Sequence, residues 1–83
     1  MSTVTIRVLF FASYADQLGT ASLDVTVPAP ARVGAIVDHI RGLPGGNCLP
    51  SQPLCALNLT HVAFHAPIRA GDELALLPPL AGG

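Results

Sequence analysis

The end of the sequence holds the first candidate for chemistry. A strand-like run, Glu73–Leu77, is followed by Pro78-Pro79-Leu80-Ala81-Gly82-Gly83. Proline fixes φ and has no N–H, so this pair should end the strand and direct the rest outward as an arm. Glycine has no Cβ, so the tip of such an arm fits a channel too narrow for other residues. A terminal Gly-Gly pair alone is a weak signal, but the whole pattern predicts a flexible tail, residues 78–83. That tail would deliver the α-carboxylate of Gly83 to another protein's active site.

Other polar side chains form no catalytic or metal-binding pattern. His61 and His65 flank a short segment at a spacing that keeps them far apart on a strand, and we expect neither these nor His39 to bind a metal. Asp72 and Glu73 are interpreted as turn and strand-entry residues, not as a catalytic carboxylate pair. The sequence therefore predicts no metal site and no permanently bound cofactor.

The composition describes a small, apolar and weakly charged protein. Its 83 residues predict a single domain, residues 1–83, with an ordered body of about 3–77. Apolar residues make up 51% and charged residues 11%, so some apolar side chains are expected on a partner-facing surface. The net charge of −1 gives no reason to expect nucleic acid or an anionic membrane as a partner.

The lack of a signal peptide, a membrane span and a disulfide framework in the sequence predicts a cytoplasmic protein. Residues 1–5 lack the pattern of a signal peptide, and no apolar run approaches a membrane span. Cys48 and Cys55 are too few for a secreted disulfide framework and lack zinc spacing, so we interpret them as buried or idle thiols. Lysine is absent, so no side-chain amine of this chain can accept an isopeptide bond.

Hydrophobic periodicity predicts the elements that position the tail. Strands are expected at residues 3–11, 22–27, 55–59, 62–64 and 73–77, with Asn58 stabilising a turn. A short helical turn is expected at 12–18 and a loop at 44–53. Residues 31–43 predict one main helix, whose apolar stripe is Val33, Ile36, Val37, Ile40 and Leu43.

These elements predict an α+β fold, a mixed sheet packed on one main helix. The simplest topology places the first and last strands parallel and adjacent in the middle. Leu9, Phe11 and Leu77 then share the face away from the helix, near the strand end from which the tail leaves. An apolar patch beside a protruding arm is where a partner would dock.

Three blocks resemble a known family, the small, sulfur-carrying subunit of molybdopterin synthase, which is a ubiquitin-like β-grasp protein. The blocks are residues 6–12 (IRVLFFA), 56–58 (ALN) and 71–83 (GDELALLPPLAGG). The last block is the specific one, and the resemblance covers nearly the whole chain apart from residues 44–53. Relatives often have an aromatic residue where this chain has Leu77.

The resemblance implies a two-stage cycle without an active site in this chain, which would be the sulfur-donating subunit of a heteromeric sulfurtransferase. An ATP-dependent adenylating enzyme would join AMP to Gly83, and a sulfur donor such as a cysteine desulfurase or rhodanese would convert it to a thiocarboxylate. The large catalytic subunit, in an expected heterotetramer, would use the sulfur to build the dithiolene of molybdopterin. Gly82 would let the tail pass, and the partner-binding residues would be Leu9, Phe11, Leu77, Pro78, Pro79, Leu80 and Ala81.

Three alternatives stay open from the sequence. The first is a sulfur carrier for thiazole (thiamine) or cysteine biosynthesis. The second is a ubiquitin-like protein modifier, for which the absence of lysine rules out only self-linked side-chain chains. The third is a plain β-grasp interaction module.

Overall fold

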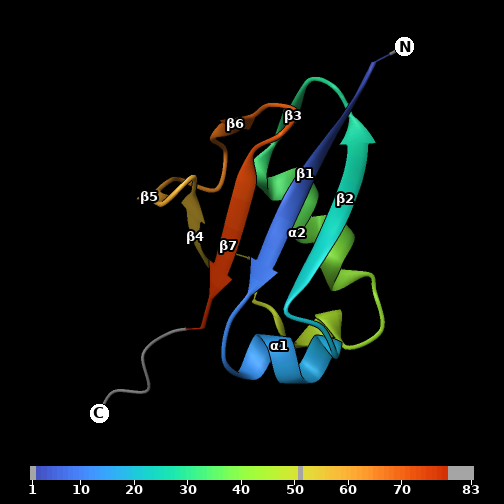
Figure 1. Cartoon of the computed structure of the whole chain (residues 1–83), viewed down its shortest axis with the longest axis vertical. Helices are drawn as coiled ribbons and strands as arrows, with labels where there is room; N and C mark the ends of the chain where they lie inside the picture. Colours follow the sequence, from blue (N-terminus) through green and yellow to red (C-terminus); the bar gives the residue numbers. More distant parts are fainter. Residues whose placement is uncertain (1, 51, 79–83) are drawn as a thin grey trace.

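The computed structural model describes residues 2–50 and 52–78 as a mixed sheet with one main helix across one face (Figure 1). The sheet has five strands in the order β2-β1-β7-β4-β5. Their bounds are Thr3–Phe10 (β1), Ser22–Pro28 (β2), Leu54–Leu57 (β4), Thr60–His61 (β5) and Glu73–Leu77 (β7). The remaining elements are the paired strands β3 (Ala31–Arg32) and β6 (Pro67–Ile68), the helices α1 (Ser13–Leu18) and α2 (Val33–Arg41), and the 3-10 turn η1 (Gly46–Cys48). This is the α+β arrangement that the sequence predicts.

The first and last strands are adjacent and parallel, as predicted. The register of β1 and β7 pairs Arg7 with Glu73 and Leu9 with Ala75. β1 also pairs antiparallel with β2, and β7 with β4. Antiparallel neighbours need only a short connection, whereas parallel neighbours need a crossover, and the chain between β1 and β7 includes α2.

Alternate residues of the two central strands pack against α2. The strand side chains in this core are exposed by 3% or less, and they are Ile6, Val8, Phe10, Leu74 and Leu76. The helix contributes four side chains with no exposed surface, Val33, Ile36, Val37 and Ile40. Both sets follow from the period of two along a strand and 3.6 along a helix.

The main helix starts at Val33, two residues later than predicted, because β3 precedes it and pairs with β6. The N–H groups of Val33 and Gly34 donate to the carbonyl oxygens of Ala66 and Phe64, at 2.9 Å each. Such groups usually need a capping side chain, and this helix has none. Neither α2 nor any other helix of the described residues reaches the length and hydrophobicity of a membrane span.

The prediction of an edge strand at residues 62–64 is wrong, because the edge strand is β5. β4 ends at Leu57, not at residue 59, and Leu57 pairs with Thr60. The two residues between them, Asn58 and Leu59, have φ values of 50° and 73°, as a tight two-residue hairpin loop requires. Asn58 is the expected turn residue, but leucine rarely adopts this backbone conformation, so the sequence pattern gives no sign that the turn is completed by Leu59.

The side chain of Asn58 ties this hairpin to the start of β7. Its Oδ1 accepts a hydrogen bond from the N–H of Glu73 (3.0 Å), and its Nδ2 donates to Oδ1 of Asp72 (3.1 Å). The other carboxylate oxygen of Asp72 accepts from the N–H of Arg69 (2.7 Å). The structure thus confirms a turn-stabilising role for Asn58, with Asp72 in the turn and Glu73 at the strand entry.

In the segment 44–53, which is predicted as a loop, residues 44–50 pack against both helices. The segment contains η1 and buries Leu49. Gly45 has a φ of 82°, and a Cβ there would collide with the carbonyl oxygen of Gln17. A Cβ on Gly46 would collide with the carbonyl oxygen of Ile40 at the end of α2. The two glycines therefore allow a close approach of this segment to the backbone of both helices.

The two thiols lie in the fold and are free. Cys55 is 3% exposed, its Sγ donates to the carbonyl oxygen of Pro53 (3.2 Å), and burial raises the pKa of Cys55 to about 11. Burial also raises the pKa of Tyr14, with smaller contributions from Cys48 and Cys55, so these groups are close to one another. Cys48 is half-buried. The prediction of buried thiols is thus confirmed for Cys55.

Gly46→Ala should destabilise the fold by about 1–3 kcal/mol, because the Ile40 carbonyl oxygen that it meets is backbone and cannot swing aside. Gly42→Ala is the matched control, since its φ is −82° and the nearest atom lies 3.5 Å from the added Cβ. Urea denaturation followed by circular dichroism should show a lower midpoint for the first variant only. Equal midpoints would contradict the close packing of residues 44–50.

Cys55 should resist alkylation by iodoacetamide in the native protein near pH 8, because only the thiolate reacts and a pKa of about 11 keeps the thiol protonated. Peptide mass spectrometry should find the label on Cys55 only after unfolding. Raising the pH from the ordinary thiol pKa of 9.0 towards 11 should lower the free energy of unfolding, since the unfolded thiol loses its proton first. Rapid native labelling at neutral pH would contradict the burial of this thiol.

Candidate functional site

The candidate site is the outer face, defined here as the face of the five-stranded sheet that points away from α2. Strand register fixes its central row, since side chains directly opposite one another share a face. Leu9 pairs with Ala75, Ala75 with Ala56, and Ala56 with His61. The row runs from Ser22 of the edge strand β2 through Leu9, Ala75 and Ala56 to His61 of the edge strand β5, so its middle is apolar and both of its edges are polar.

One end of the outer face is apolar and lies where the described part of the chain ends. Leu77 pairs with Leu54, whose side chain is 52% exposed. Phe11 follows directly after β1 and is 44% exposed. The ends of β1 and β7 lie side by side here (Figure 1), and Pro78 directly follows the last residue of β7. We call Leu9, Phe11, Leu54 and Leu77 the apolar end.

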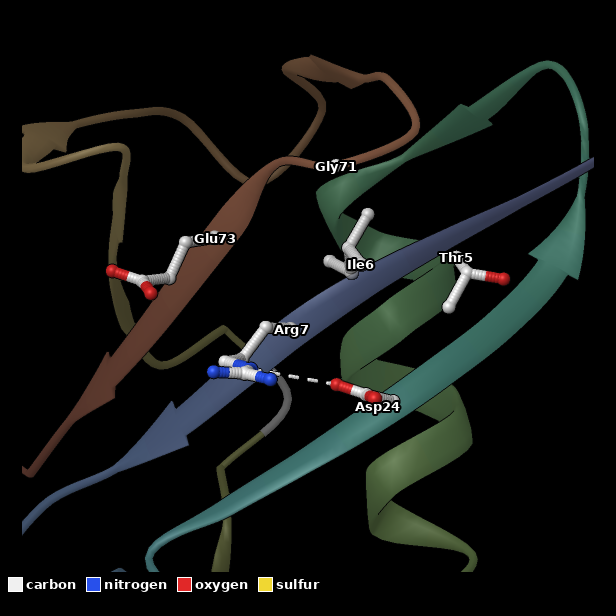
Figure 2. A pocket seen from close by; sticks show the side chains of 6 residues that line it. All are labelled: Thr5, Ile6, Arg7, Asp24, Gly71 and Glu73. Carbon is white, nitrogen blue, oxygen red and sulfur yellow. Dashed lines mark ion pairs between the residues drawn. The ribbon is translucent and has the colours of Figure 1, made fainter.

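The opposite end of the outer face is charged. Arg7 of β1 lies across from Asp24 of β2 on one side and Glu73 of β7 on the other. Arg7 Nε lies 3.5 Å from Asp24 Oδ1, and both side chains are more than 60% exposed. With Thr5 and Gly71 they line a shallow depression of about 330 Å³ (Figure 2). We call Arg7, Asp24 and Glu73 the charged end.

The predicted site residues divide into those that the structure places and those beyond it. Leu9 and Leu77 are half-buried and Phe11 is exposed, all near the strand ends from which Pro78 leaves. The predicted tail residues Pro79, Leu80, Ala81, Gly82 and Gly83 lie outside the described residues. Whether any of these residues contacts a partner stays a prediction.

Sequence reasoning missed Leu54 and His61. Leu54 stands next to the predicted start of a strand, and His61 falls where a turn would be expected if that strand continued to residue 59. Only the hairpin at Asn58 and Leu59 sets the register that brings His61 opposite Ala56. No signal in the sequence pattern marks that register.

Charged side chains of the described residues lie at the surface and form no cluster that could hold a metal ion. No charged side chain is buried among residues 2–50 and 52–78, and the buried titratable groups there are those of Tyr14 and Cys55. In the same ranges, His, Cys, Asp and Glu side chains do not gather in a group of three that could hold a metal ion. An exposed apolar patch such as the apolar end is typical of a surface that another protein covers.

Comparisons with known proteins agree with this architecture. A model of the ThiS family matches residues 8–83. The molybdopterin synthase sulfur carrier subunit of Escherichia coli (strain K12) is 36% identical over 81 residues, covering 94% of this chain and 99% of that protein. The protein of the same name from Drosophila melanogaster is 30% identical over 83 residues, covering 96% and 92%.

Solved structures show the same fold. SAMP1 from Haloferax volcanii, a small archaeal modifier protein, superposes with a TM-score of 0.82 at 28% identity, covering 95% of this chain and 99% of that chain. A chain from the complex of subunits 1 and 2 of the molybdopterin-converting factor from Helicobacter pylori has a TM-score of 0.67 at 21% identity, covering 96% and 100%. These likenesses confirm the ubiquitin-like β-grasp fold. The chain therefore belongs to the ThiS family, and its relatives there include sulfur carrier subunits of molybdopterin synthase.

Proposed function

We propose that this protein carries sulfur as a thiocarboxylate on Gly83 and donates it to form the dithiolene of molybdopterin. The observation that carries the proposal is the family match, which runs through residue 83. Relatives that are named sulfur carrier subunits also match this chain over nearly their whole length. The Pro-Pro and Gly-Gly pairs after β7 fit this use. In this proposal the chain supplies the sulfur atom that is transferred, and the partner proteins catalyse the reactions.

The proposed cycle has balanced steps. A carboxylate oxygen of Gly83 attacks the α-phosphorus of ATP, which forms an acyl adenylate and releases pyrophosphate. A donor's persulfide or sulfide sulfur then attacks the acyl carbon, and AMP leaves; with a persulfide donor, cleavage of the S–S bond by a thiol reductant frees the thiocarboxylate. Adenylation supplies the leaving group that a carboxylate lacks, so one difficult sulfur transfer becomes two easier steps. Gly82 lets the tail enter each partner's channel.

Sulfur carriage on a cysteine of this chain is less compatible with the structure. A cysteine that accepts sulfur as a persulfide needs an accessible thiolate. Cys55 is buried with its pKa raised to about 11, and Cys48 is half-buried against the core. Carriage on the terminal carboxylate needs neither thiol.

The large catalytic subunit is the proposed partner of the outer face. Phe11 and Leu54 are about half exposed at the apolar end, and they adjoin the point where Pro78 leaves β7. A partner that covers them gains the free energy of burying apolar surface and receives the tail at the same edge. A related structure is described as a complex of subunits 1 and 2 of the molybdopterin-converting factor, which supports this assignment. Covering the site also shields the thiocarboxylate from water.

Incubation with ATP, the cognate adenylating enzyme and a sulfur source should exchange one oxygen of Gly83 for sulfur. Intact-mass spectrometry should show the mass difference between these two atoms, and fragmentation should place it on the last residue. A variant that lacks Gly83 should show no exchange and keep the unfolding midpoint of the parent chain. An unchanged mass with a competent enzyme, or sulfur found on Cys48, would overturn the proposal.

Phe11→Asp should weaken binding to the large subunit about tenfold or more, because a half-exposed aromatic side chain at the apolar end is replaced by a charge that must be desolvated. Isothermal titration calorimetry gives the Kd directly. Ala35→Asp is the matched control, since it adds the same charge on the exposed surface of α2. Equal affinities of the two variants would remove the apolar end from the interface.

A further inference from the structure

We propose that the charged end of the outer face is a second contact for the large subunit, and that this subunit places a basic side chain, lysine or arginine, over Glu73. The proposal rests on the proposed function, because it assumes that the large subunit covers the apolar end. It adds the chemical character of the partner's surface and the group on this chain that sets the partner's orientation.

The charged end is continuous with the apolar end. On β1 and β7, Arg7 and Glu73 lie two residues before Leu9 and Ala75, so they point from the same face in the neighbouring row. Nothing in the described residues closes off this row, since it lines an open depression bounded by β1, β2 and β7 (Figure 2). A partner that covers the central row therefore also lies next to the charged end.

The charges at this end do not cancel. Arg7 is directed at Asp24, whereas the carboxylate of Glu73 points away from Arg7 (Figure 2). Among the described residues, Arg7–Asp24 is the one ion pair, and the side chain of Glu73 makes no hydrogen bond. Including the adjacent turn, Asp24, Asp72 and Glu73 oppose Arg7 and Arg69, which leaves one negative charge.

The available carboxylate is that of Glu73. The two oxygens of Asp72 already accept hydrogen bonds from Asn58 and from the N–H of Arg69. Asp24 is paired with Arg7 in an exposed geometry that contributes little to stability. A basic side chain of the partner could therefore pair with Glu73 without breaking a hydrogen bond or ion pair of this chain. The positive charge of Arg7 would repel the same basic side chain. Such an arrangement raises the association rate and fixes orientation more than it raises affinity.

Stopped-flow association with the purified large subunit, over a range of salt concentrations, tests the proposal through two changes of opposite sign. Glu73→Gln should slow association about threefold to fivefold at low ionic strength and weaken its salt dependence. Arg7→Gln should accelerate association by a similar factor, because Asp24 is then unpaired and the charged end is more negative. Asp38→Asn, which removes one charge from the exposed surface of α2, is the matched control and should change the rate little. Thermal unfolding of each variant confirms that the fold is intact.

Other outcomes overturn the proposal in distinguishable ways. If Phe11→Asp weakens binding while Glu73→Gln behaves as Asp38→Asn does, the apolar end docks the large subunit and the charged end does not. If Arg7→Gln slows association and Glu73→Gln accelerates it, the partner is acidic at this place. If Glu73→Gln slows association only with the adenylating enzyme, the charged end serves that enzyme. If Phe11→Asp also has no effect, docking through the outer face fails altogether, and the sulfur exchange at Gly83 remains a separate measurement.

Discussion

The parallel pairing of β1 and β7 is the constraint on which the rest of the structure depends. It places Leu9 beside Ala75 and Phe10 beside Leu76, so the two strands bury one face against α2 and present the other together. A slip of one residue would exchange the two faces of a strand, and the core side chains would then point outward. The same pairing places the end of β1 beside the end of β7, where Pro78 follows. Core, outer face and tail origin therefore follow from one register.

A carrier of this kind needs a rigid body, because the partners must find the tail at a fixed place. The ordered body is small and has few side chains for its core, so close contacts between backbone segments also hold it together. Gly45 and Gly46 let residues 44–50 approach the backbone of both helices, and the side chain of Leu49 is buried in the core. Loop carbonyls of Phe64 and Ala66 cap α2 in place of a side chain. These contacts fix α2 against the sheet without using any residue of the outer face.

The outer face divides its proposed work between two kinds of interaction. Apolar side chains near the tail provide buried surface, which holds a partner once it has docked. The charged row two residues earlier acts over a longer range, which affects the rate and orientation of the encounter. Since the two rows lie on the same strands, their spacing is set by the pleat of the sheet. A partner that matches both rows is thereby distinguished from one that matches the apolar end alone.

The sequence by itself determined the central strands, the main helix and the residues they bury, because a period of two or of 3.6 reports directly which face meets the core. It also determined the tail pattern from Pro78 to Gly83 and, through its resemblance to sulfur carriers, the proposed role of Gly83. Only the tertiary structure decided the place of β5, the register that brings His61 opposite Ala56, and the loop carbonyls that cap α2. The reason is physical: a leucine at positive φ and a helix capped by distant carbonyls are stabilised by contacts between remote residues, which leave no periodic trace along the chain.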